Sequence, residues 1–497
     1  MDRFPHKLIG GGTVLLALTA ALGWGGVSMI INGQLRQSAR LFNGSETWRN
    51  FKENPNPIYR SFYLFNIENG DAIGSGEKPK VKERGPYVYL ERQWKEDISI
   101  DKENDTIGYR QYRSYEFQPE MSAGNKEEDM ITMLNMPLLG LARMIQEVPE
   151  ASRRLMASFS EKMTAASEKI TVTHPVSELL FEGFGVRPYQ EFAEGKTEIL
   201  NEVGGDFIFP ETFMDGRFGL FEKKNFSDDG MWEITGGRKR NSAYGAMEKI
   251  NAMDSLPYWK DDTCNALNGT VPTMFQPPLK AGRAMQTFEI EYCRSRTFEF
   301  EKEDMLRGVQ SYRYLFKKED MLSPEHNPDN WCFCPYEDVS KCALNGIGHL
   351  APCMEGLPFL ISGPHFLDAD PSVLDTVEGL APDVEKHGTY MYLSPPAGII
   401  LEARKRYQLS MELGPVSGMS IFSSTPKAYV PLMWVEEATD AAKTKFTLFK
   451  FLSGLQQIVD MVRWGFLGAS IVIIVVGVFA AATRRNSLKS DKITLLQ

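Results

Sequence analysis

The chain has 497 residues, of which 42% are hydrophobic and 24% are charged, and its net charge is −10 at pH 7. This composition is typical of a globular chain with apolar segments added to it. The acidic balance argues against nucleic acid as a partner.

The first predicted element is an uncharged apolar segment at residues 8–31, which follows a short tail at residues 1–7. A helix rises about 1.5 Å per residue, so this segment can cross roughly 30 Å of hydrocarbon. A cleaved signal peptide is the alternative, but its apolar region is usually shorter, and no small-residue cleavage site is evident. We therefore predict a transmembrane helix. Its Ala17, Ala21 and Gly25 share one face, where they would let a second helix approach closely.

Residues 129–169 show a helical pattern, in which apolar side chains recur every four residues from Ala151 to Met163. This insert is rich in methionine and in basic side chains. The methionines could fill a core of the insert itself, with the cations in water. They could instead form an adaptable apolar surface for lipid, rimmed by charges that meet a carboxylate or phosphate headgroup. Under that second interpretation the ligand-binding residues are Met156, Phe159, Lys162 and Met163.

Most of the remaining chain between residues 32 and 463 is predicted to form strands, because apolar and polar residues alternate. The alternation is clear in residues 288–292, 298–301 and 407–413. Such strands bury one face in the core of a sheet and expose the other. Glu289 and Glu291 are therefore predicted to face water, as are the polar residues of the other two runs.

The region between residues 32 and 463 also contains N-glycosylation sequons. Each has the N-x-S/T pattern, which indicates a surface site on the extracellular or luminal side of a membrane. The acceptors are Asn43, Asn104, Asn225 and Asn268.

All six cysteines lie within residues 264–353, and they are Cys264, Cys293, Cys332, Cys334, Cys342 and Cys353. An even number in a region predicted to lie outside the cytosol favours three disulfides, for which there are 15 possible pairings. A metal site is the alternative, because Cys332 and Cys334 are close in sequence to His326 and His349. Their spacing is not the usual pattern of a zinc site.

The best candidate for a catalytic group is His365, which has Asp368 and Asp370 close by in sequence. No nucleophile accompanies it, and the chain contains neither G-x-S-x-G nor H-E-x-x-H. We therefore predict no enzyme, no cofactor and no metal site, and we interpret His365 as structural.

A second uncharged apolar segment at residues 464–483 is also predicted to be a transmembrane helix, followed by a tail at residues 484–497. Positive charge flanks both spans on their terminal sides, which places both termini in the cytosol. The residues between the spans are then extracellular or luminal. No cysteine lies near either membrane boundary, so palmitoylation there is excluded. The flanking basic residues are Arg3, Lys7, Arg484 and Arg485.

The C-terminal tail carries a D-x-x-x-L-L pattern, formed by Asp491, Leu495 and Leu496. Clathrin adaptors read this pattern through a basic patch and an apolar pocket, so it is a candidate sorting motif. A disordered, solvated tail is the alternative.

Short motifs along the ectodomain, in their order between two terminal spans, make the chain resemble the class B scavenger receptors. That family includes fatty-acid translocase, lysosomal integral membrane protein and the sensory neuron membrane proteins. The motifs are Phe65-Asn66, Gly85-Pro86-Tyr87, Phe218-Gly219-Leu220-Phe221, Thr235-Gly236, Cys264-Asn265, Asn268-Gly269-Thr270, Cys293-Arg294-Ser295, Pro364-His365-Phe366, Gly379-Leu380 with Pro382, and Trp434.

The resemblance implies a membrane protein with two terminal transmembrane helices and a large, mainly antiparallel β-barrel ectodomain. It also implies an apical helical bundle, which would be residues 129–169, and an apolar tunnel that runs toward the bilayer. The implied disulfides are Cys264–Cys332, Cys293–Cys353 and Cys334–Cys342.

The resemblance further implies a receptor that captures hydrophobic or polyanionic ligands and passes lipid through the tunnel to the membrane. Expected partners are membrane lipids, fatty acids, sterols or carotenoids, lipoprotein particles, clathrin adaptors through the tail, and a second copy of the chain. The plasma membrane is the expected location. An endosomal or lysosomal membrane protein that exports lipid or escorts a luminal hydrolase is one alternative, and a sensory or adhesion receptor is another.

Overall fold

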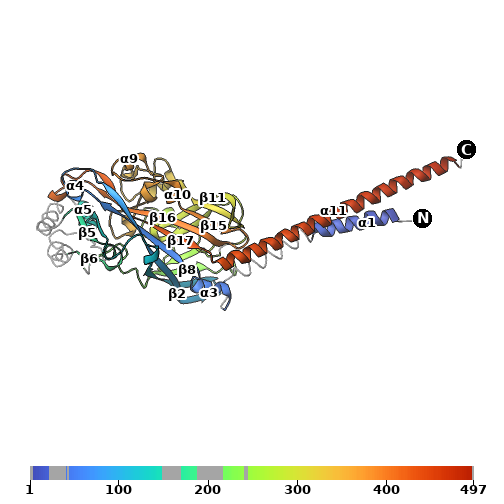
Figure 1. Cartoon of the computed structure of the whole chain (residues 1–497), viewed down its shortest axis with the longest axis horizontal. Coiled ribbons are helices and arrows are strands. Elements are labelled where there is room, and N and C mark those ends of the chain that lie inside the picture. Colours follow the sequence, from blue (N-terminus) through green and yellow to red (C-terminus); the bar gives the residue numbers. More distant parts are fainter. Residues whose placement is uncertain are drawn as a thin grey trace.

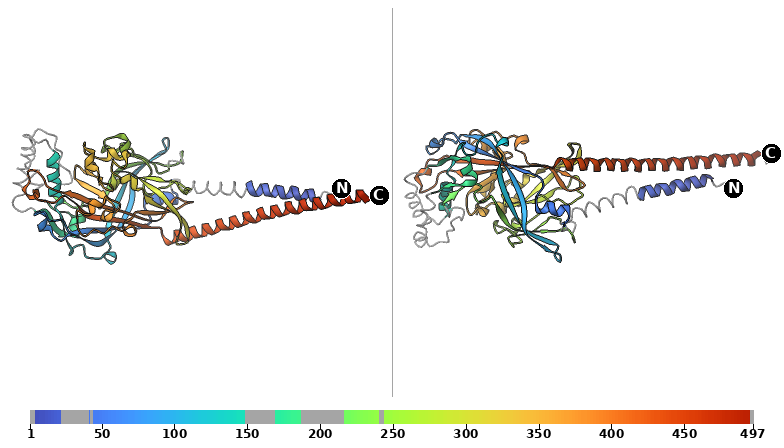
Figure 2. Two further views of the ribbon diagram at one scale, coloured as in Figure 1. Left: turned by 90° about the horizontal axis from the view of Figure 1, so that it is seen from above. Right: turned by 60° about the horizontal axis from the view of Figure 1, so that its bottom comes forward.

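The structure is a computed structural model, and it describes residues 4–21, 41, 44–147, 169–186, 216–239 and 244–494. A β-rich body lies at one end, and two long helices extend from the other, with both chain termini at the far tip (Figures 1 and 2). These helices are α1 (Phe4–Ala20) and α11 (Lys443–Thr494).

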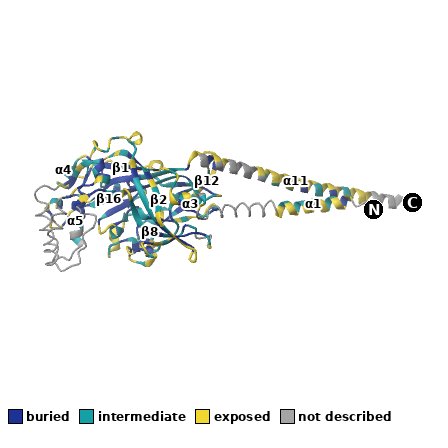
Figure 3. Ribbon diagram, turned by 90° about the horizontal axis from the view of Figure 1, so that it is seen from below, coloured by how far each residue is buried: buried dark blue, intermediate teal, exposed yellow. Residues whose placement is uncertain are grey.

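Helix α11 contains the one stretch among the described residues that is long and apolar enough to cross a bilayer, Asp460–Asn486. Its apolar side chains are largely exposed, including Val472, Val476 and Phe479, and yellow segments of the α11 ribbon mark exposed residues in Figure 3. Exposed valine and phenylalanine at this density are unfavourable in water and suit hydrocarbon. We call α1 and α11 together the rod, which thus carries the candidate membrane span.

Helices α1 and α11 run antiparallel and approach closely at two glycines. A Cβ added at Gly12 would lie 2.7 Å from Cγ1 of Ile474, and one at Gly477 would lie 2.8 Å from Cγ1 of Ile9. The predicted small-residue face of Ala17, Ala21 and Gly25 does not form this contact: Ala17 and Ala21 are exposed, and Gly25 lies outside the described residues. Glycine gives the closest approach because it has no Cβ, so the two helices touch at a glycine of each.

The body is built on a 13-stranded antiparallel sheet in the order β10-β11-β12-β15-β16-β17-β1-β2-β3-β8-β9, with β14 paired to β16 and β13 to β14. The strands are β1 (Ile58–Ile67), β2 (Val81–Asp101), β3 (Thr106–Phe117), β8 (Ser227–Thr235), β9 (Met247–Ile250), β10 (Met285–Glu289), β11 (Arg294–Leu306), β12 (Val309–Phe316), β13 (Gly348–His349), β14 (Phe359–Ser362), β15 (Tyr390–Ser394), β16 (Ile399–Leu413) and β17 (Ala428–Asp440). Short helices connect the strands or lie beside them: α3 (Glu46–Lys52), α4 (Gly70–Ile73), α8 (Asp262–Asn265), α9 (Pro371–Leu374) and α10 (Val384–His387).

A segment centred on Thr270 joins the two edges of this sheet and makes it nearly a closed barrel. On the β10 side, the Thr270 amide donates to Gln286 O at 3.0 Å. On the β9 side, the Val271 amide donates to Gly245 O and the Met247 amide to Gly269 O, each at 3.0 Å. Gly269 has φ +89°, and a Cβ there would lie 2.2 Å from Gln286 O, so the junction requires glycine.

The insert at residues 129–169 begins with a strand where the sequence predicted helix. Strand β4 (Met130–Leu134) pairs with β5 (Thr171–Pro175), and α5 (Met136–Glu147) follows it. Asn135 caps this helix by accepting a hydrogen bond from the Leu138 amide at 3.1 Å. In Figure 1, α5 and β5 lie at the end of the body opposite the rod, which we call the membrane-distal end, and we call the end beside the rod the membrane-proximal end. The other small sheet there is formed by β6 (Phe184–Gly185) and β7 (Arg217–Phe218).

Three disulfides hold residues 264–353 together, and they join the pairs that the resemblance implies: Cys264–Cys332, Cys293–Cys353 and Cys334–Cys342. No cysteine is free, so the alternative of a cysteine metal site is wrong. Of the sequon asparagines, Asn104, Asn225 and Asn268 are exposed, whereas Asn43 lies outside the described residues.

Candidate functional site inside the barrel

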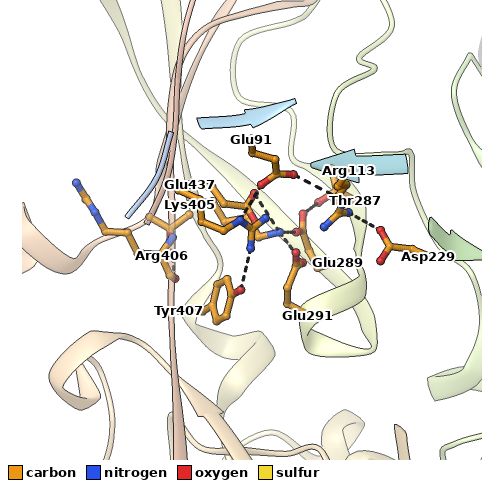
Figure 4. Close-up of polar contacts among 12 residues, drawn as sticks. Glu91, Arg113, Asp229, Thr287, Glu289, Glu291, Lys405, Arg406, Tyr407 and Glu437 are labelled. Carbon is orange, nitrogen blue, oxygen red and sulfur yellow. Dashed lines mark hydrogen bonds and ion pairs between the residues drawn. The ribbon is translucent and has the colours of Figure 1, made fainter. Parts of the chain in front are cut away.

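Charged side chains from seven of the strands and one short helix turn toward one another inside the barrel (Figure 4). We call them the ion-pair layer. Its members are Arg60 on β1, Glu91 on β2, Arg113 on β3, Asp229 on β8, Glu289 on β10, Glu291 on the 3-10 helix η6 (Ile290–Tyr292), Lys405 on β16 and Glu437 on β17.

Arg60 lies at the centre of the layer and is only 1% exposed. Its Nε is 2.7 Å from Oε2 of Glu91, and its Nη2 contacts Oε1 of Glu437. Its Nη1 donates to the hydroxyl of Tyr407 at 3.2 Å. Three neighbouring strands and β16 are thus joined through one guanidinium, which supplies donors in a fixed planar geometry.

Lys405 carries the layer across the interior of the barrel. Its Nζ is 2.7 Å from Oε2 of Glu289 and 2.6 Å from Oε2 of Glu291. In the order of the sheet, β11, β12 and β15 separate β16 from β10. Neighbouring strands lie about 4.8 Å apart, so a direct contact over three intervening strands crosses the interior. The ion-pair layer therefore braces opposite walls.

Arg113 extends the layer toward β8. Its Nη2 lies 2.8 Å from Oδ2 of Asp229, and its Nε lies 3.7 Å from Oε1 of Glu91. Gln93 donates to the same Glu91 oxygen at 2.7 Å. Both oxygens of this buried carboxylate are therefore engaged, as burial of a charge requires.

Carboxylates outnumber cations in the layer, five to three. Burial raises the pKa of Glu437 despite the attraction of Arg60 and Lys405, and repulsion by Glu291 and Glu91 adds a smaller contribution in the same direction. Burial opposes the charge of Lys405, but attraction to Glu289 and Glu291 holds its pKa well above the usual value. Glu437 is therefore the carboxyl group that most readily keeps a proton, and Lys405 stays an ammonium.

An aromatic cluster adjoins the layer on its membrane-distal side. Phe62 follows Arg60 by two residues on β1, and Tyr89 precedes Glu91 by two residues on β2. Phe62 and Phe221 have ring centroids 4.9 Å apart, and Tyr89 and Phe181 are 4.8 Å apart. The Arg60 guanidinium lies 5.6 Å from the Phe221 centroid. The barrel interior is therefore apolar and aromatic on one side of the layer. The members of the aromatic cluster are Phe62, Tyr89, Tyr115, Phe181 and Phe221.

A second cluster, on the outer side of the sheet, contains His365. Its Nε2 lies 2.7 Å from Oε2 of Glu83, and Trp434 Nε1 donates to the same oxygen at 2.6 Å. The ring of His387 stacks on that of His365 at 4.5 Å. Among the described residues, Glu83, His365 and His387 are the group whose ligand atoms could surround a metal ion.

The hydrogen bonds of the two histidines argue against a metal there. The Ala381 amide donates to Nδ1 of His365 at 3.1 Å, and the Asp383 amide donates to Nδ1 of His387 at 3.0 Å. A neutral imidazole that accepts at Nδ1 carries its proton on Nε2, so neither ring offers a free Nε2 lone pair. The arrangement instead ties the loop around His365 to Glu83 on β2 and Trp434 on β17, which is a structural role.

Residues 10–481 match the CD36 family. The chain belongs to the CD36 family. It is 30% identical to scavenger receptor class B member 1 of Sus scrofa over 426 residues, which is 86% of this chain and 79% of the relative. It is 28% identical to sensory neuron membrane protein 2 of Manduca sexta over 501 residues, covering 97% and 94% of the two chains. It is also 29% identical to sensory neuron membrane protein 1 of Mamestra brassicae, covering 95% and 90%.

Several sequence-predicted site residues of this CD36-family chain lie outside the part that the structure describes. These are the insert residues Met156, Phe159, Lys162 and Met163, and the leucines Leu495 and Leu496 of the tail motif. The backbone of Asp491 belongs to the end of α11. The ligand-binding role of the insert residues and the sorting role of the tail motif remain predictions.

Sequence reasoning missed the ion-pair layer, although the strand pattern contains a signal for it. Arg60 occupies the alternate positions of a strand with Ile58, Phe62 and Leu64, which are core residues. Lys405 likewise precedes Tyr407 by two residues, on the same face. A charge in register with a buried apolar face is the feature that would have identified both.

Proposed function

We propose that this chain is a membrane receptor of the class B scavenger type, which binds hydrophobic ligands and passes them through its barrel toward the membrane. The names of its relatives support a receptor. The observation that supports passage through the interior is the aromatic cluster, which presents apolar surface inside a nearly closed barrel. An alkyl chain gains about 0.8 kcal/mol for each CH₂ moved from water to apolar surroundings, so such an interior lowers the barrier to lipid transfer.

The ion-pair layer divides that route. Charged groups that have lost their contact with water are stabilised only by one another, so an alkyl chain that separated them would leave buried charges unpaired. We infer that ligand rests on the membrane-distal side of the layer, against Phe62 and Phe221, and that transfer requires Lys405 to move away from Glu289 and Glu291. A polar headgroup could replace some of these contacts.

The topology that fits this function has spans at residues 8–31 and 464–483, with both termini in the cytosol. Helix α1 beside α11 supports it, because the two termini lie at the same end of the rod (Figure 2). Under this topology the sequons and disulfides face the outside or a lumen, and the tail can meet clathrin adaptors. A second copy of the chain remains a proposed partner.

The receptor proposal predicts saturable binding of a fluorescent fatty acid by the full chain reconstituted in nanodiscs. Met156→Glu or Phe159→Glu is expected to weaken binding at least about tenfold, because a charge in an apolar entry surface costs about 1.4 kcal/mol or more. Titration by fluorescence measures this directly. Met305→Glu is the matched control, because Met305 is an exposed methionine far from the insert. It lies at the end of β11, and Gly308 in the following hairpin lies against Lys450 of α11.

No saturable binding by the unaltered chain would reject the receptor proposal for lipid. Equal binding by the Phe159 and Met305 variants would remove the insert from the entry route while keeping binding itself.

An endosomal or lysosomal location is the second candidate, and the tail motif Asp491, Leu495 and Leu496 favours it. The stability of the ectodomain at acidic pH bears on this choice. Burial lowers the pKa of His349 to about 4, and burial is also the main reason that the pKa of His387 is lowered to about 4. Both rings are therefore neutral in the folded chain at neutral pH.

We expect the chain to lose on the order of 2 kcal/mol of stability between pH 7 and pH 5. The unfolded chain protonates its histidines near pH 6.5 and the folded chain does so only near pH 4, so the full stabilisation is present above pH 6.5 and falls as the pH drops through this window. The estimate is reduced from the full shifts for residual contact with solvent. Unfolding midpoints measured at pH 7, 6 and 5 test it.

His387→Asn, which keeps an acceptor for the Asp383 amide, is expected to flatten part of this dependence. A midpoint that does not change from pH 7 to pH 5 would contradict the burial argument and would suit a resident of an acidic compartment. A sensory or adhesion receptor is the third candidate, favoured by the long matches to the sensory neuron membrane proteins.

A further inference from the structure

Lys95 on β2 is a second lysine of the inward face, on the membrane-proximal side of the ion-pair layer. It lies four residues beyond Glu91 on the same strand, so both side chains project to the same side of the sheet. Its Nζ is 4.6 Å from the ring centroid of Phe51 and 5.1 Å from that of Tyr109. These two rings pack edge to face at 5.2 Å. Helix α3 supplies Phe51 and so forms the wall on this side.

The amine of Lys95 has no carboxylate partner among the described residues. Within the described part of the chain it makes no ion pair, whereas Lys405 makes three contacts with carboxylates. The charged group that acts on it is the cation Arg113, which itself pairs with Glu91 and Asp229. Lys95 is nevertheless only half-buried, so a small reagent can reach part of its surface.

These surroundings favour the free amine. Burial, together with repulsion by Arg113, lowers the pKa of Lys95 to about 7. A desolvated lysine beside a second cation is the arrangement by which proteins make an amine nucleophilic at neutral pH. The two ring faces stabilise the ammonium by cation–π contact, but they provide no counter-ion.

We propose that Lys95 binds hydrophobic aldehydes covalently, as a reversible imine on Nζ. The Nζ lone pair forms a bond to the carbonyl carbon, and the carbonyl π pair moves to oxygen. One proton passes from nitrogen to that oxygen to give the carbinolamine. Loss of the second nitrogen proton with the hydroxyl group, as water, leaves the C=N bond. The step needs no oxidant or reductant, and water reverses it.

The ring faces around Lys95 distinguish an aldehyde from a carboxylate ligand. The face of an aromatic ring is electrically negative, so Phe51 and Tyr109 disfavour a carboxylate beside them but accept a neutral carbonyl and its alkyl chain. The inference rests on the proposed function in one respect, because a long aldehyde must enter the barrel to reach Lys95.

The test is reductive trapping in the full-length chain, purified in detergent at pH 7. The chain is incubated with tetradecanal and cyanoborohydride, and alkylated lysines are located by peptide mass spectrometry. Because a pKa near 7 leaves about half of the amine unprotonated, whereas an ordinary lysine has about one part in a thousand, we expect at least about tenfold more adduct at Lys95 than at exposed Lys302. Lys405, on the same inward face but held by carboxylates, is the internal control and should stay unmodified.

A parallel reaction with formaldehyde separates the reactivity of the amine from access by a long chain. Lys95→Arg should lose the tetradecanal adduct and keep fatty-acid binding. Labelling of Lys95 by neither aldehyde would overturn the inference and leave the receptor proposal standing if fatty acid still binds. Labelling by formaldehyde alone would also overturn it, and if fatty-acid binding were absent too, the proposed function would fail with it. Equal labelling of Lys95 and Lys302 would show an ordinary surface amine and overturn the inference.

Discussion

Replacing Arg60 with methionine is expected to lower the free energy of unfolding by about 3–5 kcal/mol. The change leaves Glu91 and Glu437 buried without the cation that both contact, and it removes the donor to the Tyr407 hydroxyl. Methionine is flexible and of similar length, so it fills much of the space and a cavity contributes little. Denaturant unfolding of the purified full chain, followed by tryptophan fluorescence, measures the loss.

Arg92→Met is the matched control, because Arg92 pairs with Glu116 on the outside of the same sheet. Their side chains are 65% and 66% exposed, and the nearest contact is 3.5 Å. Exposed pairs of this kind contribute about 0–1 kcal/mol.

A second background tests the mechanism. Glu437→Gln combined with Arg60→Met should recover part of the loss, since one unpaired carboxylate is then neutral. If Arg60→Met cost no more than Arg92→Met, the ion-pair layer would not brace the barrel.

The antiparallel strands were predictable from sequence because alternation reports burial of one face. The same argument failed for Glu289, which was expected in water and is fully buried. Alternation separates two faces but does not say which medium lies against each. At β10 the glutamate faces the barrel interior and Phe288 packs on Trp232 behind it.

Strand β16 gives a second case with a different cause. Gln408 and Ser410 were expected to be wet, but both are fully buried. Strand β14 pairs with this part of β16, and the loop around His365 covers the face: side-chain Oε1 of Gln408 accepts from the His365 amide at 2.7 Å. His365 and Gln408 are 43 residues apart in sequence, so no local pattern around β16 predicts that this face is covered.

The family motifs mark where the backbone is constrained, which is why they located the fold better than the site. Gly379 has φ +97°, and a Cβ there would lie 1.9 Å from Val81 O. Gly269 closes the barrel, and His365 and Trp434 share Glu83. None of the motifs contains Arg60, Glu91, Lys95 or Lys405. The interior chemistry of this barrel therefore requires the structure, because strands far apart in sequence supply each contact.

The second large effect is expected from removing the Cys293–Cys353 disulfide by changing both cysteines to alanine. The bond closes a loop with a sequence separation of 60, whereas Cys334–Cys342 spans only 8. Chain-entropy arguments then give about 4 kcal/mol for the first bond and about 2.5 kcal/mol for the second. Thermal unfolding of the full chain without reductant should rank the two double variants in that order.

The position of Cys293 suggests that this loss reaches the barrel interior. Cys293 follows η6 directly and precedes β11, so its disulfide anchors the arm that carries Glu289 and Glu291 to Lys405. Trp259 Nε1 also donates to Cys293 O at 2.8 Å. When the Cys293–Cys353 variant is combined with Lys405→Met, the total loss of unfolding free energy should be smaller than the sum of the two separate losses. Both changes weaken the same contact, so their effects are not additive. The Cys334–Cys342 variant, whose loop makes no contact with Lys405 among the described residues, should add to Lys405→Met in full. Additive losses in both pairs would mean that the disulfide stabilises its own loop and leaves the ion-pair layer unaffected.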